Sequence, residues 1–354
     1  MENAVVRPSH RRLGIARAAV ALTLAAMTLG STGVRAEDAT PDASPEASPI
    51  AIPADAAAGL TFGLIQKSGD QQYFVDEANG FKEIVEGAGG EVIVQDVQLN
   101  SDAAISAVDT MIGAGVAGIA IVVPDQQIGS AVAEKAAAAG IPLIALDDGI
   151  KASDGSDVAF AGFDGTDMGT SVGEKAVELW QAAGSPTDGV GALSVEVQTL
   201  SVCNDRTNAS RKLMTDAGFP ADSIFAVPYD GTAPAAIDAA ATVVTAHPEI
   251  TTWIAWGCND EGVQGAIRAL ESAGVTADNT IAVGLGAYLA CPEWKSGNPT
   301  GFKAALYISG VDVGRSGATA LVLAATQGVP LPAKTIAPTT MTTPENYVEA
   351  GVVC

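Results

Sequence analysis

Two adjacent carboxylates, Asp147 and Asp148, stand at the end of an apolar run that the sequence predicts to be a strand. Together they offer up to four acceptor oxygens, which suits a ligand with several hydroxyl donors, a cation, or acid and base chemistry. Either carboxylate could instead cap the following turn. Small molecules bind at such strand ends in open α/β sheets, so the pair is the first candidate for a binding site.

Three more side chains are expected near the end of the first predicted strand, residues 60–66. Lys67 could donate to hydroxyl or ring oxygens and offset the two carboxylates. Tyr73 and Phe74 open the next helix, and adjacent aromatic rings can face the C–H side of a sugar while excluding water. The alternatives are a solvated lysine, a core Phe74 and a half-exposed Tyr73.

The second half of the chain offers a matching set after its own strands. Arg206 could donate two parallel hydrogen bonds to vicinal hydroxyls or to a carboxylate, or it could pair with Asp205 at the surface. Asn259 and Asp260 follow a predicted strand, residues 252–256, and could bind a ligand or cap the next helix.

Metal-dependent and covalent catalysis find little support. After residue 36 the sequence has one histidine, His247, with no partners at metal-ligand spacing. A Ser–His or Cys–His pair would depend on that one histidine, and the sequence has no G-x-G-x-x-G after the first strand and no phosphate-binding G-x-x-x-x-G-K-[ST]. We therefore expect no metal, no cofactor and no enzyme activity.

The chain is strongly acidic, with a net charge of −23. Its first 36 residues hold five Arg and one Glu, and the remainder has 13 basic and 40 acidic residues, a net charge of −27. Such a charge repels phosphate backbones, so nucleic acid is not an expected partner.

The N-terminus has the pattern of an export signal. Four Arg in the first 17 residues precede an apolar stretch, residues 18–30, and a small-x-small site that predicts cleavage after Ala36. An uncleaved membrane anchor is the alternative. Residues 37–58, rich in Pro, Ala, Ser and acids, predict a disordered spacer. We expect a protein exported to the periplasm or cell surface, tethered to the membrane if the signal is retained.

From residue 60 to residue 328 short apolar runs alternate with helical patterns, and the alternation restarts near residue 165. The run 118–123 is almost wholly apolar, which implies a strand buried on both faces and a parallel sheet. Two α/β halves are more economical than one sheet of ten strands. The expected parts are a first lobe of residues 59–164 with 300–328 as a returning segment, a second lobe of residues 165–299, and a hinge-crossing tail of residues 329–354.

Four cysteines follow residue 36, and an even count in an oxidising compartment favours disulfides. Cys203–Cys258 or Cys258–Cys291 would lie near the site, and Cys354 would be in a second bridge or free. The sequence leaves the pairing open.

Between about residues 60 and 348 the chain resembles the periplasmic sugar-binding proteins of ABC importers, of the ribose and arabinose type. The resemblance implies the type I periplasmic binding protein fold, an α/β architecture of two Rossmann-like domains with mainly parallel sheets, joined by a three-crossing hinge and binding sugar in the cleft. Its strongest segments are VPDQQIGSAVAEKAAAAGIPLIALDD (123–148), DAGFPADSIFAVP (216–228), TTWIAWGCNDEGVQGAIRALESAG (251–274) and TTMTTPENY (339–347).

The resemblance also implies ligand-binding residues, with four departures from the arabinose-binding members. Gln71 replaces a carboxylate, Cys258 an apolar thioether, Gly286 an amide and Leu289 a carboxylate. Unpaired hydroxyls there would cost about 1–3 kcal/mol each, so the resemblance implies a mode of binding rather than arabinose itself. The residues that keep the family's types are Lys67, Tyr73, Phe74, Asp147, Asp148, Phe163, Arg206 and Asn259.

The expected function is a non-enzymatic receptor that binds one pentose or hexose and delivers it to an ABC permease by domain closure. We expect a monomer, and the sequence leaves a chemoreceptor open as a second partner. One alternative is a receptor for a nucleoside, a signalling furanose or an amino-acid-like ligand. Another is a hydrolase or isomerase using Asp147 and Asp148. A sugar-responsive transcription regulator would carry a basic helix-turn-helix where this chain has an export signal and an acidic spacer.

Overall fold

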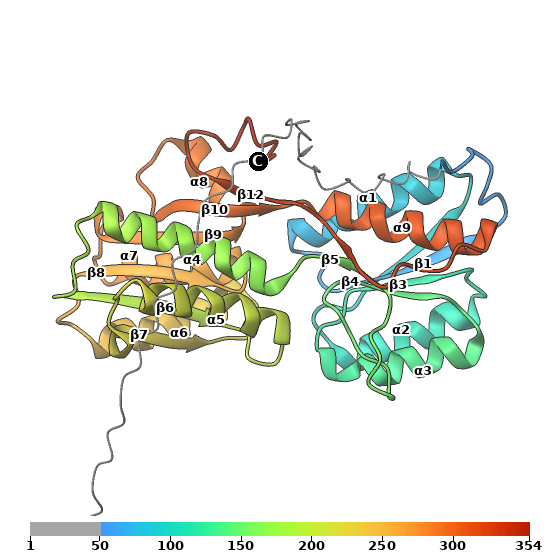
Figure 1. The fold of residues 1–354 in the computed structure, drawn as a ribbon, viewed down its shortest axis with the longest axis horizontal. Coiled ribbons are helices and arrows are strands. Elements are labelled where there is room, and N and C mark those ends of the chain that lie inside the picture. Colours follow the sequence, from blue (N-terminus) through green and yellow to red (C-terminus); the bar gives the residue numbers. More distant parts are fainter. Residues whose placement is uncertain (1–50) are drawn as a thin grey trace, which may run out of the picture. The chain divides into compact units, whose positions relative to one another are not determined.

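The computed structural model describes residues 51–354 (Figure 1). The predicted export signal and most of the predicted spacer, residues 1–50, lie outside the described residues. The described part contains two sheets of six strands each. Both follow the βαβ pattern expected from the alternating sequence, which places the carboxyl ends of neighbouring strands at one edge of each sheet.

The first sheet is parallel throughout and has the order β11-β5-β4-β3-β1-β2. Helices α1 and α9 cover one face and α2 and α3 the other (Figure 1). Burial on both faces explains why its central strands are apolar runs rather than alternating ones. Its elements are β1 (Thr61–Gln66), α1 (Gln72–Gly87), β2 (Glu91–Asp96), α2 (Ser101–Gly113), β3 (Ile119–Ile121), η1 (Gln126–Ile128), α3 (Gly129–Ala139), β4 (Leu143–Asp147), β5 (Phe160–Gly162), α9 (Gly310–Gln327) and β11 (Thr335–Ile336).

The second sheet has the order β12-β10-β9-β8-β6-β7, with only its edge strand β12 antiparallel. Helix α4 packs on α5, and α6 packs on α7. Its elements are α4 (Gly165–Ala182), β6 (Val190–Glu196), α5 (Ser201–Asp216), η2 (Ala221–Ser223), β7 (Ile224–Pro228), α6 (Ala233–Ala246), β8 (Thr252–Gly257), α7 (Asp260–Ser272), η3 (Ala277–Asn279), β9 (Thr280–Gly286), α8 (Ala290–Ser296), β10 (Phe302–Ile308) and β12 (Thr339–Thr342).

The described chain passes between the two sheets in three places: after β5, between β10 and α9, and between β11 and β12. These are the three crossings that the resemblance implied. The last crossing is a short extended segment between β11 and β12. The tail therefore adds β11 to the first sheet and β12 to the second.

Two of the expected boundaries are wrong. Residues 300–308 were assigned to the first lobe, but β10 pairs in parallel with β9 in the second sheet, and the return to the first begins with α9. Residues 51–58 were assigned to the disordered spacer, but Ala57 is fully buried and its N–H donates to the Ala88 carbonyl at 2.8 Å. The small side chain of Ala57 packs into the first lobe. A composition rich in alanine does not reveal that such a residue is buried.

Helices α1 and α9 approach so closely that glycine is required at their contact. A Cβ on Gly80 would lie 2.2 Å from the Val311 carbonyl oxygen. A Cβ on Gly310 would lie 2.3 Å from the carbonyl oxygen of Tyr73, a predicted site residue. The contact therefore sets the position of the helix turn that opens onto the site.

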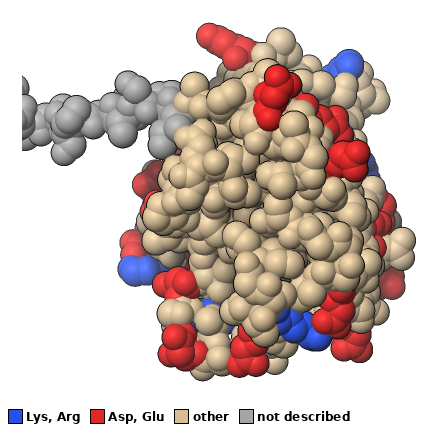
Figure 2. All heavy atoms as spheres, turned by 90° about the vertical axis from the view of Figure 1, so that its right-hand side faces the viewer, with Lys and Arg blue, Asp and Glu red and all other residues tan. Residues whose placement is uncertain are grey.

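Surface charge is dispersed on the face of the first lobe that Figure 2 shows. Acidic side chains lie around the margin of a surface that is otherwise mostly uncharged, with few basic side chains among them. On this face the acidic side chains are therefore not gathered into one central patch. Among residues 51–354, no helix combines the length and the apolar character needed to cross a membrane.

Candidate functional site

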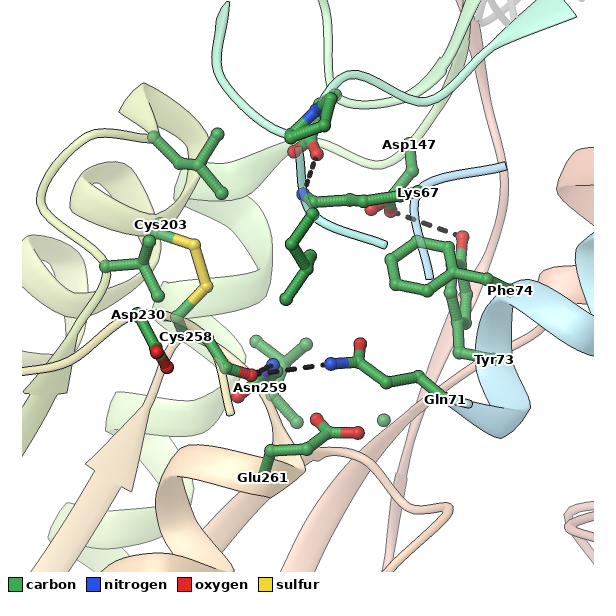
Figure 3. Close-up of a pocket in the computed structure, with 18 of the residues that line it drawn as sticks. Lys67, Gln71, Tyr73, Phe74, Asp147, Cys203, Asp230, Cys258, Asn259 and Glu261 are labelled. Atoms are coloured by element: carbon green, nitrogen blue, oxygen red, sulfur yellow. Dashed lines mark hydrogen bonds and ion pairs between the residues drawn. A yellow bond between two sulfur atoms is a disulfide. The ribbon is translucent and has the colours of Figure 1, made fainter. Parts of the chain in front are cut away.

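A cavity of about 430 Å³ is lined by residues that follow strands of both sheets (Figure 3). The first sheet contributes the segments after β1 and β4, and the second contributes α5 and the segments after β8 and β9. Ten of the twelve predicted site residues line it: Lys67, Gln71, Tyr73, Phe74, Asp147, Asp148, Arg206, Cys258, Asn259 and Gly286.

The other two predicted residues lie elsewhere. Phe163 is buried at the first crossing and lines a separate hollow beside the hinge. Leu289 does not line the cavity either, and its backbone N–H donates to Asp260 Oδ2 at 3.0 Å. The ligand contacts of Phe163 and Leu289 stay predictions, since neither residue is part of the cavity lining.

Lys67 and Asp148 form a buried ion pair on the side of the first sheet. Lys67 Nζ lies 2.6 Å from Asp148 Oδ2, and the residues are 7% and 1% exposed. Lys67 Nζ also lies 5.8 Å from the centroid of the Phe74 ring, within reach of a cation–π interaction. The pair holds one donor and one acceptor at fixed positions on the cavity wall.

Asp147 has a left-handed backbone, with φ of +56°, and the Asp148 N–H donates back to the Leu146 carbonyl. Aspartate tolerates this conformation better than most residues, and the tight turn presents both carboxylates to the cavity. Tyr73 OH donates to Asp147 Oδ1 at 3.2 Å. Burial raises the pKa of Asp147 to about 6, with a further contribution from Asp148, while Arg206 and Lys67 act to lower it.

Arg206 supplies the cation on the side of the second sheet. Its Nη1 donates to the Cys258 carbonyl oxygen at 2.9 Å, and its Nη2 lies 3.9 Å from Asp147 Oδ1. The residue is 5% exposed, and Nε and Nη2 have no hydrogen-bond partner among the described residues. A buried donor without a partner costs about 1–3 kcal/mol, which a bound acceptor would recover.

Asn259 both lines the cavity and caps α7, so the two alternatives that the sequence left open are compatible. Its Oδ1 accepts from the Gly262 N–H at 3.0 Å and from the Tyr229 hydroxyl. Its Nδ2 donates to the Gly231 carbonyl oxygen at 3.4 Å. The neighbouring Asp260 is buried and holds the turn after β9 through the Leu289 N–H.

Two disulfides resolve the pairing that the sequence left open: Cys203–Cys258, with Cα atoms 4.8 Å apart, and Cys291–Cys354, with Cα atoms 5.6 Å apart. Both cysteines of the first pair line the cavity. Cys258 therefore contributes a disulfide rather than a thiol to the wall, and it joins α5 to the segment after β8.

Sequence reasoning missed several residues that line the cavity, among them Tyr229, Asp230 and Glu261. Tyr229 and Asp230 directly follow β7, so the strand-end rule applied to that strand would have found them, whereas Glu261 lies within α7. Burial, followed by the charges of Asp260 and Asp70, raises the pKa of Glu261 to about 7. Within residues 51–354 no three His, Cys, Asp or Glu side chains form a cluster that could hold a metal ion.

A family model described as the periplasmic binding protein domain matches residues 62–328. The chain belongs to this family. The match runs from β1 to α9 and leaves out only the edge strands β11 and β12, so every residue that lines the cavity of this periplasmic binding protein lies within it.

Two curated relatives resemble most of this periplasmic binding protein. An ABC transporter L-arabinose-binding periplasmic protein of Azospirillum brasilense is 28% identical over 274 residues, 76% of this chain and 82% of that one. The L-arabinose-binding periplasmic protein of Escherichia coli (strain K12) is 28% identical over 254 residues, 71% of this chain and 77% of that one.

Solved structures share the fold. An ABC transporter solute binding protein from Agrobacterium vitis, bound with alpha-D-tagatopyranose, superposes with a TM-score of 0.70 at 19% identity. The superposition covers 83% of this chain and 97% of that one. The two six-stranded sheets therefore have the architecture of the type I periplasmic binding proteins.

Proposed function

We propose that this periplasmic binding protein is the sugar receptor of an ABC importer. It binds one monosaccharide, a pentose or a hexose, in the cavity between the two sheets and delivers it to a membrane permease. The observation that carries the proposal is the approach of Arg206 Nη2 to within 3.9 Å of Asp147 Oδ1, because charged hydrogen-bonding groups from both sheets thereby meet on one cavity. The L-arabinose-binding relatives support the assignment of a sugar.

The groups on the cavity wall suit the hydroxyls and ring oxygen of a sugar. Asp147 and Asp148 accept from hydroxyls, while Lys67, Arg206 and Asn259 donate to oxygens. Hydrogen bonds to charged partners contribute about 1.5–3 kcal/mol each, so a few of them suffice for specific binding. Tyr73 and Phe74 supply apolar surface for the C–H side of the ring.

Domain closure would couple binding to delivery. A sugar held by Asp148 on one sheet and Arg206 on the other binds the closed arrangement more tightly than the open one, and so shifts the population toward it. The hinge is formed by the three crossings, of which the last is a short extended segment. The permease then has a ligand-dependent surface to recognise.

The same geometry gives no support to acid and base catalysis by the two aspartates. Asp148 is held by Lys67 at 2.6 Å, and Asp147 accepts from Tyr73. Both are thus arranged as fixed acceptors, and we propose that the protein is not an enzyme. Export through the N-terminal signal, a location in the periplasm or at the cell surface and a monomeric state belong to the same proposal. A chemoreceptor as second partner stays open.

Calorimetric titration of the protein with neutral pentoses, hexoses and deoxysugars tests the proposal. At least one sugar should bind to the wild type, and Arg206→Met should abolish its binding. Lys151→Met, which alters an exposed lysine outside this cavity, is the control and should bind as the wild type does. If the folded wild-type protein binds no sugar at all, the proposed sugar specificity is overturned.

A further inference from the structure

The two ends of the cavity differ in charge balance. Within residues 51–354, its lining contains two basic side chains, Lys67 and Arg206. Lys67 pairs with Asp148, and Arg206 lies beside Asp147, so this end carries two cations and two anions. A neutral polyol fits such a balanced end. The buried Nη2 of Arg206, which has no hydrogen-bond partner in the described chain, independently indicates that a ligand completes this part of the cavity.

Glu261 marks the other end. It stands in the first turn of α7, lines the cavity and is half-buried. Figure 3 shows its carboxylate on the same side of the cavity as Gln71. No Lys or Arg between residues 51 and 354 forms an ion pair with it, and the two cations of the cavity lie within 4 Å of Asp148 and Asp147 instead.

The charges that act on Glu261 are those of acids. Burial raises its pKa, and the charges of Asp260, the preceding residue on α7, and of Asp70, in the segment between β1 and α1, raise it further. Asp230 also lines the cavity, and its Oδ1 accepts from the N–H and the hydroxyl of Thr232. The side-chain amide of Gln71 carries no positive charge to offset these acids. Its Nε2 donates to the Gly231 carbonyl oxygen at 3.4 Å. A ligand atom at this end therefore meets a negative field with no basic side chain of the described chain to compensate it.

Gly286 leaves space beside this acidic end. Its φ of +131° belongs to a region that glycine alone adopts readily, and it carries no side chain toward the neighbouring Asp260. A ligand substituent can approach here where another residue would place a Cβ 3.4 Å from Asp260 Oδ2.

We infer that the ligand of this cavity is an aminated sugar or polyol, with hydroxyls at the balanced end and a protonated amine bound by Glu261. The inference rests on the proposed function and narrows its substrate class. A neutral hydroxyl at Glu261 would make one hydrogen bond and leave the surrounding negative charge uncompensated. An ammonium group would form a charge-assisted hydrogen bond and offset the field of Asp260 and Asp70 as well.

Matched ligands provide the test. Calorimetry would compare D-glucosamine with D-glucose and D-galactosamine with D-galactose, together with the two N-acetyl derivatives, which keep the substituent but lose the charge. At least one amine should bind about 10- to 100-fold more tightly than its hydroxyl and acetamido counterparts, the range expected when a neutral hydrogen bond becomes a charged one. Glu261→Gln should remove that preference.

The control is Glu134→Gln, which makes the same change in charge on exposed α3, outside this cavity, and should keep the preference. Neutral sugars that bind as tightly as the amines would overturn the inference and leave the proposed function standing. A preference for amines that survives in Glu261→Gln would overturn the role of Glu261. Failure of every sugar, charged or neutral, would overturn the proposed function together with the inference.

Discussion

Lys67 Nζ lies 2.6 Å from Asp148 Oδ2, and both residues are almost fully removed from solvent. Burying two charges carries a large desolvation penalty, and the contact between Lys67 and Asp148 offsets it. The pair thus stabilises a wall of the cavity while keeping charged groups ready for a ligand. Removing one partner leaves the other buried and uncompensated.

Lys67→Met should therefore lower the free energy of unfolding by about 3–5 kcal/mol and abolish sugar binding. Urea unfolding measures the first effect and calorimetry the second. The matched control is Lys151→Met, whose pair with Asp157 has the same 2.6 Å separation but is exposed, with side chains 64% and 77% accessible. That variant should lose less than about 1 kcal/mol. Equal losses in the two variants would show that burial does not set the strength of the Lys67 pair.

The convergence of Lys67, Asp148, Arg206 and Asn259 on one cavity could be predicted in two steps. The carboxyl ends of parallel strands meet at one edge, so strand prediction brings Lys67 near Asp148 in the first sheet and Arg206 near Asn259 in the second. That the two sets face a common cleft was implied by the family resemblance. The type of each residue then indicates its chemistry. The ends of the strands can be predicted because the apolar runs in the sequence mark them clearly.

Other features depend on contacts that local pattern does not encode. Strand β10 belongs to the second sheet because it pairs with β9. The sequence of β10 does not indicate this choice, because strands of similar composition in the first sheet could equally serve as its neighbours. Leu289 is not part of the cavity lining, and its backbone N–H is bound by Asp260, a contact across 29 residues that local pattern does not encode. Glu261 lies within the first turn of α7 rather than at the end of β8, so the strand-end pattern does not indicate it.

The Cys203–Cys258 disulfide connects the two elements that carry Arg206 and Asn259. Cys203 precedes Arg206 by three residues on α5, Cys258 directly precedes Asn259, and the Cys258 carbonyl accepts from Arg206. The double variant Cys203→Ser/Cys258→Ser should therefore weaken sugar binding about tenfold, in addition to a loss of stability of about 2–4 kcal/mol. Calorimetry and chemical unfolding under non-reducing conditions measure the two effects.

The second disulfide provides the control for that experiment. Cys291 and Cys354 are 63 residues apart, against 55 for the first pair, so loss of either bridge should cost a similar amount of stability. Neither Cys291 nor Cys354 lines the cavity. Cys291→Ser/Cys354→Ser should keep its affinity for sugar, and a parallel loss of affinity in both double variants would refute a specific role for Cys203–Cys258.

The acidic end of the cavity should make the ligand-free protein less stable as the pH rises. Burial raises the pKa of Glu261 from 4.5 to about 7 and that of Asp260 from 3.8 to about 6. Groups that bind protons more tightly in the folded state contribute stability below about pH 4, and this contribution is lost as pH rises through 6–7. Thermal unfolding should therefore show a falling midpoint between pH 5 and pH 8.

Glu261→Gln should remove part of this dependence, leaving the variant about 1–2 kcal/mol more stable than the wild type at pH 8 but not at pH 4. The comparison uses ligand-free protein, since a bound cation would reverse the effect. Glu134→Gln on exposed α3 should follow the wild-type curve. A Glu261→Gln curve parallel to that of the wild type from pH 4 to 8 would contradict the assigned origin of the pH effect.

The contact between α1 and α9 gives a test of how the fold positions the site. Gly80→Ala would place a Cβ 2.2 Å from the Val311 carbonyl oxygen, a backbone atom that can move only if the helices separate. The variant should lose about 1–3 kcal/mol of stability, and it should bind sugar more weakly because α1 carries Tyr73 and Phe74. Urea unfolding and calorimetry on the same samples measure both losses.

Gly87→Ala is the matched control, since it makes the same substitution in the same helix. A Cβ on Gly87 would meet no atom within 4 Å, so alanine there should stabilise the protein by up to about 0.5–1 kcal/mol through its higher helix propensity. A loss of stability in Gly80→Ala and a gain in Gly87→Ala would distinguish the effect of packing from that of helix propensity, because both substitutions are in the same helix. If Gly80→Ala is as stable as Gly87→Ala and binds sugar normally, the close approach of α1 and α9 has no part in holding Tyr73 and Phe74 at the cavity.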